Sequence, residues 1–389
     1  MVASRHDGHV TARDGGVTAR DVAVLLGGPS AEHDVSLVSG RAIAEALSER
    51  GHRVEGWLLD MAGAWWKLPP AAMDPALPVT AYDLPGSLGA DGPFFAGTAL
   101  DALRARSRTP VCWIALHGPF GEDGAVQALC ESAGLTYTGS GVAASAVGMD
   151  KALFKRLVGA MGMPIVPWLE VRADGFVRDP AGVLARLQAF AASVPERRLI
   201  VKPAGLGSSV GVAIVHRPDE PPELEHALVD AFRYDDTLVV EACLAGPREL
   251  EASVIGNDPQ RLEVFGPGEV FPGHDFYDYV AKYQQGVSRT TDRPELTADL
   301  RQRVRSLAAQ SFAAIGAEGF ARVDFLLAGE HLYLSEINTI PGFTPISLFP
   351  ALCAAGGYDF GTVAERIMEL ALEREAHRPD RTLSRADLP

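Results

Sequence analysis

Two acidic residues and one amide occur near the end of the chain at positions where a short hairpin would bring them together. Asp324 lies in one apolar run, and Glu336 and Asn338 end the next, with residues 328–330 between the runs. Glu336 and Asn338 are two residues apart and therefore share one face of a strand. Apolar neighbours are expected on that face: Val323, Phe325, Leu332 and Leu334. Carboxylates are costly there unless a cation accompanies them, and such oxygen ligands suit magnesium beside phosphates. A solvated hairpin edge is the alternative.

A turn rich in glycine and serine lies between two further predicted strands, residues 199–202 and 211–215. Its small residues would let backbone N–H groups close over a phosphate chain, with Ser208 and Ser209 as additional hydroxyl donors. Lys202 precedes the turn and would neutralise phosphate charge. It is one of only five lysines in the chain, which suggests a need for a compact ammonium. Because no P-loop ending follows the glycines, an ordinary flexible turn is the alternative.

Length, charge and cysteine content narrow the class of protein. A chain of 389 residues, 47% hydrophobic and 22% charged, is long enough for two or three domains. The net charge of −15 argues against a nucleic-acid binder, which needs a basic surface. The four cysteines show no CxxC spacing, which favours reduced thiols and a cytoplasmic protein. No apolar run approaches the ~18 residues of a membrane span, so no membrane partner is expected. Together with the negative charge, this leaves neither nucleic acid nor membrane as an expected partner.

Apolar runs and helical periodicities predict an α/β protein. Strands at 21–26 and 54–59 flank a helix at 36–50, a βαβ pattern that implies a parallel sheet. Further strands are predicted at 111–116, 237–241, 250–255, 321–327 and 331–337, and helices at 125–133, 151–161, 298–315 and 360–373. We interpret residues 65–97 as a long irregular connection and residues 271–291 as a lid or binding loop.

As an ordered set, the motifs resemble those of the ATP-grasp family and, within it, of the D-alanine:D-alanine ligases. The resemblance extends from about Val22 to Leu372. The matching stretches are residues 25–36 (LLGGPSAEHDVS), 115–118 (ALHG), 121–124 (GEDG), 137–141 (YTGSG), 149–151 (MDK), 202–211 (KPAGLGSSVG), 276–283 (FYDYVAKY), 321–324 (ARVD) and 336–344 (EINTIPGFT). Any one motif is weak, whereas the ordered set is highly specific.

The resemblance implies an N-terminal parallel-sheet α/β domain followed by an ATP-grasp fold of two subdomains, which is α+β. The implied segments are a disordered tail (1–20), an N-terminal substrate-binding domain (21–150), a central ATP-grasp subdomain (151–246), a C-terminal ATP-grasp subdomain with the catalytic and metal site (247–375) and a second tail (376–389).

The resemblance also implies roles for individual residues. ATP would contact Lys151, Lys202, Ser208, Ser209, Glu241, Leu244, Glu249 and Lys282. Magnesium, as two ions, or manganese would bind Asp324, Glu336 and Asn338. The implied catalytic residues are Glu32, Ser208, Tyr283, Arg322, Gly342 and Ser347, of which the first three form a hydrogen-bonded trio that closes the site. The substrates would meet Glu32, His117, Arg322, Gly342, Ser347 and Leu348.

The implied activity is ATP-dependent ligation of two D-alanines through D-alanyl phosphate, for peptidoglycan precursors, in a cytoplasmic homodimer. One alternative keeps the fold and takes D-lactate or D-serine as second substrate, although residues 279–283 fit the dipeptide-forming type. A ligase of specialised metabolism that joins other amino acids is another. A non-catalytic ATP-binding regulator is a third, against which the complete metal set argues.

Four departures from the family pattern put substrate choice or phosphate binding in question. Gly205 stands where an arginine is common, and Val280 where a glutamate is usual. Pro247 and Arg248 together make the spacing from Glu241 to Glu249 one residue longer. Residues 288–294 lack the expected Pro-Ala pair.

Overall fold

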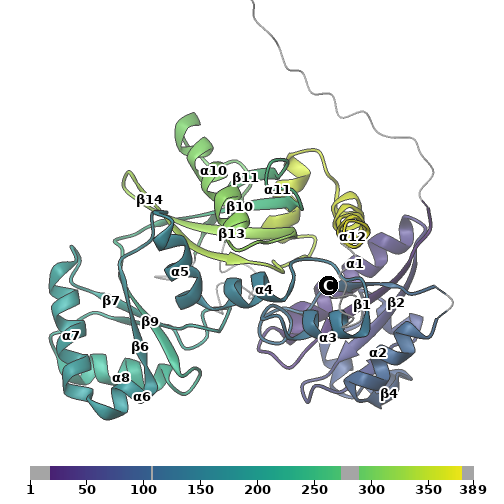
Figure 1. Ribbon diagram of the computed structural model, residues 1–389, viewed down its shortest axis with the longest axis horizontal. Coiled ribbons are helices and arrows are strands. Elements are labelled where there is room, and N and C mark those ends of the chain that lie inside the picture. The colour runs from purple at the N-terminus through teal and green to yellow at the C-terminus, as the bar shows by residue number, and fades with distance from the viewer. Residues whose placement is uncertain (1–17, 107, 273–288, 379–389) are drawn as a thin grey trace, which may run out of the picture.

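The structure, a computed structural model, describes residues 18–106, 108–272 and 289–378. Its strands form three sheets, which Figure 1 spreads along the longest axis of the molecule. The sheet built from the N-terminal residues contains parallel pairs, and the other two sheets are antiparallel. This combination confirms the predicted α/β class with an α+β second part.

The first sheet and its helices comprise β1 (Asp21–Gly27), α1 (His33–Glu49), β2 (Arg53–Leu59), β3 (Trp65–Lys67), β4 (Asp91–Phe94), α2 (Ala96–Arg104), β5 (Val111–Ile114) and α3 (Ala125–Ala133). The strand order is β4-β3-β2-β1-β5, and β1 runs parallel to β2 and β5, as predicted. Val22 to Leu26 are fully buried, which is typical of a parallel strand covered on both faces.

The interpretation of residues 65–97 as a long irregular connection is wrong. β3 pairs antiparallel with β2 and β4, so this segment extends the first sheet by two strands. β3 has three residues and β4 has four, too few for an alternation of apolar and polar residues to be recognised. Short 3-10 turns lie between them at Pro70–Met73, Val79–Asp83 and Pro85–Leu88.

The second sheet follows α4 (Val142–Met149) and α5 (Lys151–Ala160) and comprises β6 (Trp168–Arg172), α6 (Ala173–Arg178), α7 (Pro180–Ser193), β7 (Leu199–Pro203), β8 (Ala213–Val215), α8 (Pro221–Ala231) and β9 (Thr237–Ala242). β7 and β8 pair antiparallel, which confirms that the Gly/Ser turn joins a hairpin. Asp150 caps α5, because its side chain accepts the N–H groups of Ala152 and Leu153 at 2.9 Å. α5 packs against β9.

The third sheet and the last helices comprise β10 (Arg248–Gly256), β11 (Glu263–Phe271), β12 (Arg289–Thr291), α10 (Ala298–Ala314), β13 (Gly319–Ala328), β14 (His331–Asn338), α11 (Leu348–Ala355) and α12 (Phe360–Ala376). Its strand order is β12-β11-β10-β13-β14. β13 and β14 form the predicted acidic hairpin, with Gly329 and Glu330 at its tip. β12 occupies the end of the segment interpreted as a loop, whose residues 273–288 lie outside the described part.

A shared aromatic core ties the end of the chain to the first sheet. Phe320, Phe343 and Phe349 belong to the buried cluster that contains Trp113 of β5. The ring centroids of Trp113 and Phe343 are 5.3 Å apart. Figure 1 shows the result: α12, at the yellow end of the chain, lies beside the purple α1. The loops that follow β1 and β5 are thereby held close to the segment after β14.

Several sequence-based expectations concern the chain as a whole. The boundaries near residues 150 and 246 stay predictions, and the predicted tails lie outside the described residues except for 18–20 and 376–378. The four cysteines are free thiols. Within the described ranges, no helix is both long and apolar enough to cross a membrane.

Candidate active site

A cavity of about 370 Å³ lies between the second and third sheets. Its apolar lining includes Ile200, Val212, Ile214, Leu244 and Leu326. Its charged lining includes Lys151, Lys202, Glu241, Glu249, Glu251, Arg322, Asp324 and Glu336. Apolar walls beside convergent charges suit a ligand with a flat base and a chain of phosphates.

Three carboxylates lie side by side on adjacent strands of the third sheet. Glu251 on β10 is the register partner of Asp324 on β13, and Asp324 is the partner of Glu336 on β14. Directly opposed residues of antiparallel strands share one face. The predicted pair is therefore brought together, and Asn338 joins it by donating a hydrogen bond of 3.0 Å to Asp324. Glu251 is a third carboxylate that sequence reasoning missed, although its spacing from Glu249 on a predicted strand could have indicated it.

The apolar residues expected on this face lie on the opposite one. Val323 and Phe325 alternate with Asp324 and are buried in the cluster that contains residues of α10. Leu334 joins that cluster because β14 contains a bulge: Asp324 pairs with Glu336, but Phe325 pairs with Leu334. The extra residue shifts the alternation of side chains by one position. A strict two-residue alternation cannot predict this shift.

Arg322 neutralises the centre of the carboxylate row. Its Nε and Nη2 atoms donate to the two oxygens of Asp324, both at 2.7 Å, and Nε lies 3.3 Å from Glu251. Burial works against the charged guanidinium, but the surrounding carboxylates raise the pKa of Arg322 well above its ordinary value. Such a bidentate pair is the strongest form of charged hydrogen bond. Arg322 is thus the cation that allows like charges to face one another here.

The donor set around Asp324 fits a hard divalent cation that is completed by phosphate oxygens. Two carboxylates, Asp324 and Glu336, stand opposite each other with the Asn338 amide beside them. Magnesium bound with phosphates takes only one or two carboxylates from the protein. In the described part of the chain, no cluster of three or more His, Cys, Asp or Glu side chains could hold an ion by itself. The set therefore suits an ion that arrives with phosphates.

Lys151 connects the Gly/Ser turn to the carboxylate row. Its Nζ atom donates to the carbonyl of Leu206 at 2.6 Å and lies 3.6 Å from Glu336. In the turn itself, Ser208 and Ser209 adopt φ values of 51° and 56°, a left-handed conformation that is strained for residues other than glycine. Backbone N–H groups in a turn conformation can form a concavity that suits an anion.

The departure at Gly205 has a local explanation. The backbone N–H of Gly205 donates to Asp235 at 2.6 Å. A Cβ atom at Gly205 would lie 3.2 Å from the same carboxylate oxygen. Asp235, which sequence reasoning missed, thus anchors the start of the turn at the position where the resemblance led us to expect an arginine.

Lys202 and Glu241 form an ion pair at the cavity wall, with Nζ 2.7 Å from Oε2. Burial would lower the pKa of Lys202, but Glu241 raises it above its ordinary value. Burial likewise would raise the pKa of Glu241, yet Lys155 and Lys202 lower it to about 2. Both groups are therefore charged at neutral pH. Sequence reasoning assigned no role to Lys155.

Glu32, in the loop after β1, meets the Gly/Ser turn. The Ser208 hydroxyl donates to Oε1 of Glu32 at 2.5 Å across 176 residues of sequence. Gly118, after β5, has a φ of 73°, which favours glycine, and a Cβ atom there would approach Oε2 of Glu32 to 2.6 Å. Glu32 and Gly118 thus follow the carboxyl ends of β1 and β5, where ligands bind in open α/β sheets. Tyr283, the third member of the predicted trio, and Lys282 lie outside the described residues.

His117 follows β5, next to Gly118, and both of its ring nitrogens are hydrogen-bonded to other parts of the protein. Nε2 is 2.9 Å from the Ser39 hydroxyl, and Nδ1 is 3.0 Å from the carbonyl of Ile340. Burial lowers the pKa of His117, although Glu32 works in the opposite direction. A neutral imidazole in this position connects α1 to the segment after β14.

Gly342, Ser347 and Leu348 lie in that segment and at the start of α11. A Cβ atom at Gly342 would be 3.3 Å from the Ser347 hydroxyl, which in turn bonds Thr344. Leu348 is buried and packs with Val270 of β11. Leu244 and Glu249, both predicted to contact ATP, line the cavity. Of the two residues that together lengthen the spacing from Glu241 to Glu249, Pro247 lines the cavity and Arg248 begins β10 and binds both oxygens of Glu269 at 2.7 Å.

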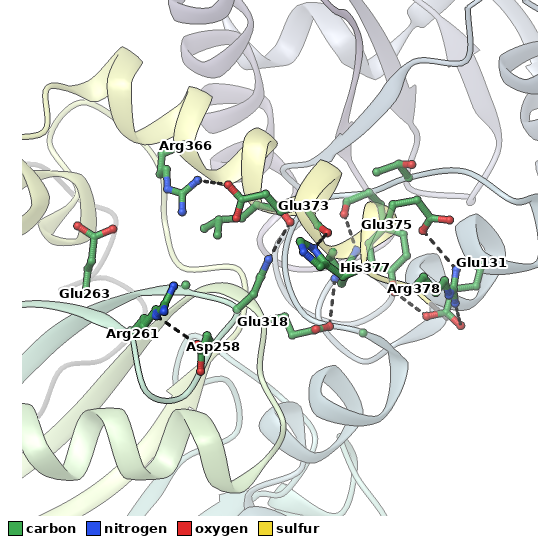
Figure 2. A pocket seen from close by; sticks show the side chains of 17 residues that line it. Glu131, Asp258, Arg261, Glu263, Glu318, Arg366, Glu373, Glu375, His377 and Arg378 are labelled. Carbon is green, nitrogen blue, oxygen red and sulfur yellow. Dashed lines mark hydrogen bonds and ion pairs between the residues drawn. The ribbon is translucent and has the colours of Figure 1, made fainter. Parts of the chain in front are cut away.

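A larger cavity of about 730 Å³ lies away from these residues, between α12, α3 and the turn after β10 (Figure 2). Figure 2 shows its acidic and basic side chains facing one another in pairs, for example Glu373 with Arg366 and Asp258 with Arg261. Arg374 further bonds the carbonyl of Tyr137. None of the residues predicted to bind ATP, metal or substrate lines this cavity, so we assign it no part in the site.

Comparison with known proteins gives matches over most of the chain. The family model described as D-ala D-ala ligase N-terminus matches residues 21–140, and the model of the C-terminus matches residues 157–369. A D-alanine–D-alanine ligase of Chlorobium limicola is 38% identical and covers 91% of this chain and 97% of its own. One from Kineococcus radiotolerans is 39% identical, with 91% and 96% covered.

Solved structures of similar architecture support these matches. The D-alanine–D-alanine ligase from Coxiella burnetii has a TM-score of 0.77 at 30% identity and covers 92% of this chain and 96% of its own. A D-Ala:D-Ser ligase from Enterococcus faecalis has a TM-score of 0.76, with 91% and 100% covered. Its identity is 24%, so this likeness concerns the fold alone.

Proposed function

This chain belongs to the D-alanine–D-alanine ligase family, from which we propose that it joins two D-alanines to D-alanyl-D-alanine with ATP, as a step toward peptidoglycan. The observation that carries the proposal is the convergence of Asp324 and Glu336 with Lys151 and Lys202 on one cavity, with Asn338 hydrogen-bonded to Asp324 beside it. The ATP-grasp fold and the ligase character follow from the family.

In this proposal the nucleotide lies between the second and third sheets. The base rests among the apolar side chains of β7, β8 and β13, near Glu241 and Leu244, and Glu249 holds the ribose. Lys151, Lys202, Ser208 and Ser209 face the phosphates, with Lys282 as a further cation from the undescribed segment. Asp324, Glu336 and Asn338 would hold magnesium, as two ions, or manganese, which would neutralise the transferring phosphate charge.

The reaction has two steps. The carboxylate of the first D-alanine attacks the γ-phosphate, which gives D-alanyl phosphate and ADP. The amine of the second D-alanine then attacks the carbonyl carbon, and inorganic phosphate leaves. Arg322 and the N–H of Gly342 stabilise the oxyanion that forms in this second step. Glu32 and Ser208, with Tyr283, orient the first D-alanine, His117 supports that pocket, and Ser347 and Leu348 border the second.

Phosphate release with different substrates tests this function. We expect ATP-dependent release with D-alanine alone and the appearance of D-alanyl-D-alanine. A requirement for D-lactate or D-serine would instead identify a depsipeptide- or serine-forming ligase of the same fold. Release with other amino acids would indicate specialised metabolism. ATP binding without release in any mixture would support a regulator and overturn the proposed activity.

Removing the Ser208 hydroxyl should weaken the connection between the two walls of the site. We expect Ser208→Ala to lower kcat/KM for D-alanine about 10- to 100-fold, because a hydrogen bond to a charged group contributes roughly 1.5–3 kcal/mol. Steady-state kinetics at saturating ATP would measure this. Ser193→Ala, an exposed serine that bonds only its own helix, should keep wild-type values. Unchanged kinetics in Ser208→Ala would contradict the role of the bond to Glu32.

The homodimer and the cytoplasmic location stay predictions of the resemblance. Light scattering on the purified protein would measure the oligomeric state directly.

A further inference from the structure

Lys155 is a lysine in the protein interior, with 1% of its side chain exposed. It lies on α5 between buried neighbours such as Phe154 and Val158. An ammonium in such a place costs several kcal/mol unless an anion accompanies it. Its Nζ atom is 2.7 Å from Oε1 of Glu241, close enough for an ion pair but without the direction of a good hydrogen bond.

Glu241 therefore stands between two lysines. Lys155 approaches Oε1 and Lys202 approaches Oε2, both at 2.7 Å. The two lysines differ in what else they face. Lys202 lines the cavity and has 16% of its side chain exposed, whereas Lys155 does not line the cavity. One cation is thus available to a ligand, and the other is fixed behind the carboxylate.

The surroundings of Glu241 explain why two cations are present. Val239 and Glu241 alternate with Leu238 and Val240, which belong to the apolar core of the second sheet. Glu241 points instead to the side that α5 covers, where 2% of its side chain is exposed. A carboxylate buried to this degree needs a permanent counter-ion. If Lys202 were the only counter-ion of Glu241, it could not move to another anion without leaving the buried carboxylate charge of Glu241 unpaired.

We propose that Lys155 is a positioning residue that keeps Glu241 neutralised from behind, so that Lys202 can turn from Glu241 to the nucleotide phosphates. The carboxylate oxygen that Lys202 leaves can then accept a hydrogen bond from the exocyclic amine of the base. This inference rests on the proposed function, because it assumes that an adenine nucleotide enters the cavity. Burial lowers the pKa of Lys155 while Glu241 opposes that effect, in keeping with a cation held by this carboxylate.

Replacing Lys155 by methionine keeps the length of the side chain and removes its charge. Lys202 should then remain paired with Glu241, so the phosphates would have to compete with the buried carboxylate for the Lys202 ammonium. We expect the Lys155→Met protein to bind ADP at least about tenfold more weakly, by calorimetry, because losing one partner of a buried charge cluster is costly. Adenosine carries no phosphate, so its inhibition constant against ATP should change much less. If Lys155 had only a structural role, its replacement would weaken the binding of ADP and of adenosine to the same degree.

Two further variants keep the test decisive. Val158→Ala creates a cavity on the same helix and lowers stability, but it should leave the ratio of ADP to adenosine affinity unchanged. Glu241→Gln removes the charge that Lys155 is proposed to neutralise. In the Glu241→Gln background, adding Lys155→Met should change the affinity for ADP very little. This comparison can also be made if the Lys155→Met single variant folds poorly.

Each outcome distinguishes the inference from the function on which it rests. Selective loss of ADP binding, absent in the Glu241→Gln background, supports the role of Lys155. Three results would overturn the role of Lys155 while the proposed function stands. They are an equal loss of affinity for ADP and adenosine, no loss of ADP affinity, and a loss of ADP affinity that is the same in the Glu241→Gln background. Absence of ADP binding by the wild-type protein overturns both.

Discussion

Glu336→Gln should be nearly inactive while remaining folded. We expect kcat to fall at least about 10²- to 10³-fold, because the variant loses a carboxylate ligand of the cation that would balance the phosphate charge. The side chain of Glu336 is 27% exposed and lies opposite Asp324. Glutamine has nearly the same shape and removes one of three like charges from the row. The melting temperature should therefore not fall. Phosphate release and thermal unfolding would measure the two quantities on the same preparation.

The same hairpin offers a matched control. Glu330 lies exposed at the tip, two residues from the end of β13. Glu330→Gln makes the identical chemical change and should keep wild-type turnover. Calorimetric titration with Mn²⁺ and ADP should show weaker metal binding in Glu336→Gln and none of this effect in Glu330→Gln. Normal turnover by Glu336→Gln would show that the metal site has been assigned to the wrong residues.

Arg322→Met should be inactive, and its stability should depend on magnesium more strongly than that of the wild-type protein. Arg322 holds both oxygens of Asp324 and lies 3.3 Å from Glu251. Without it, carboxylates face one another with no guanidinium between them, and breaking such a buried pair costs about 3 kcal/mol or more. In EDTA we therefore expect a clear loss of the free energy of unfolding. A divalent cation can then take the place of the lost charge, and it no longer competes with Arg322 for Asp324.

Thermal unfolding in EDTA and in magnesium measures this difference. Magnesium should raise the melting temperature of Arg322→Met by more than it raises that of the wild-type protein. Arg248→Met breaks another bidentate pair of the same sheet, with Glu269. Its loss of stability should not depend on magnesium, because Arg248 has no bond to the predicted metal ligands. Equal magnesium responses of Arg322→Met and the wild-type protein would refute the competition for Asp324.

Local patterns predicted the long elements of the fold well. Long elements such as β1, α10, β13 and β14 each bury a continuous set of side chains. Their apolar residues therefore recur in a pattern that can be recognised in the sequence. The short strands β3 and β4 were missed because three or four residues carry no period. Leu334 was assigned to the wrong face of the acidic hairpin because the bulge at Ser335 shifts the alternation, and a bulge has no reliable sequence signal. Val323 and Phe325 are the immediate neighbours of Asp324, so strict alternation already places them on the opposite face.

The sequence by itself determined which chemical groups this protein possesses and in what order. Asp324, Glu336, Asn338, Lys202 and the Gly/Ser turn were recognisable because their types and short spacings are fixed by covalent connection. The tertiary structure alone decided their partners. Glu251 joins the carboxylate row, and Lys155 stands behind Glu241, because strand register and the packing of α5 bring together residues that are distant in the chain. Such pairings depend on burial, which makes charge neutralisation necessary but leaves no local mark in the sequence.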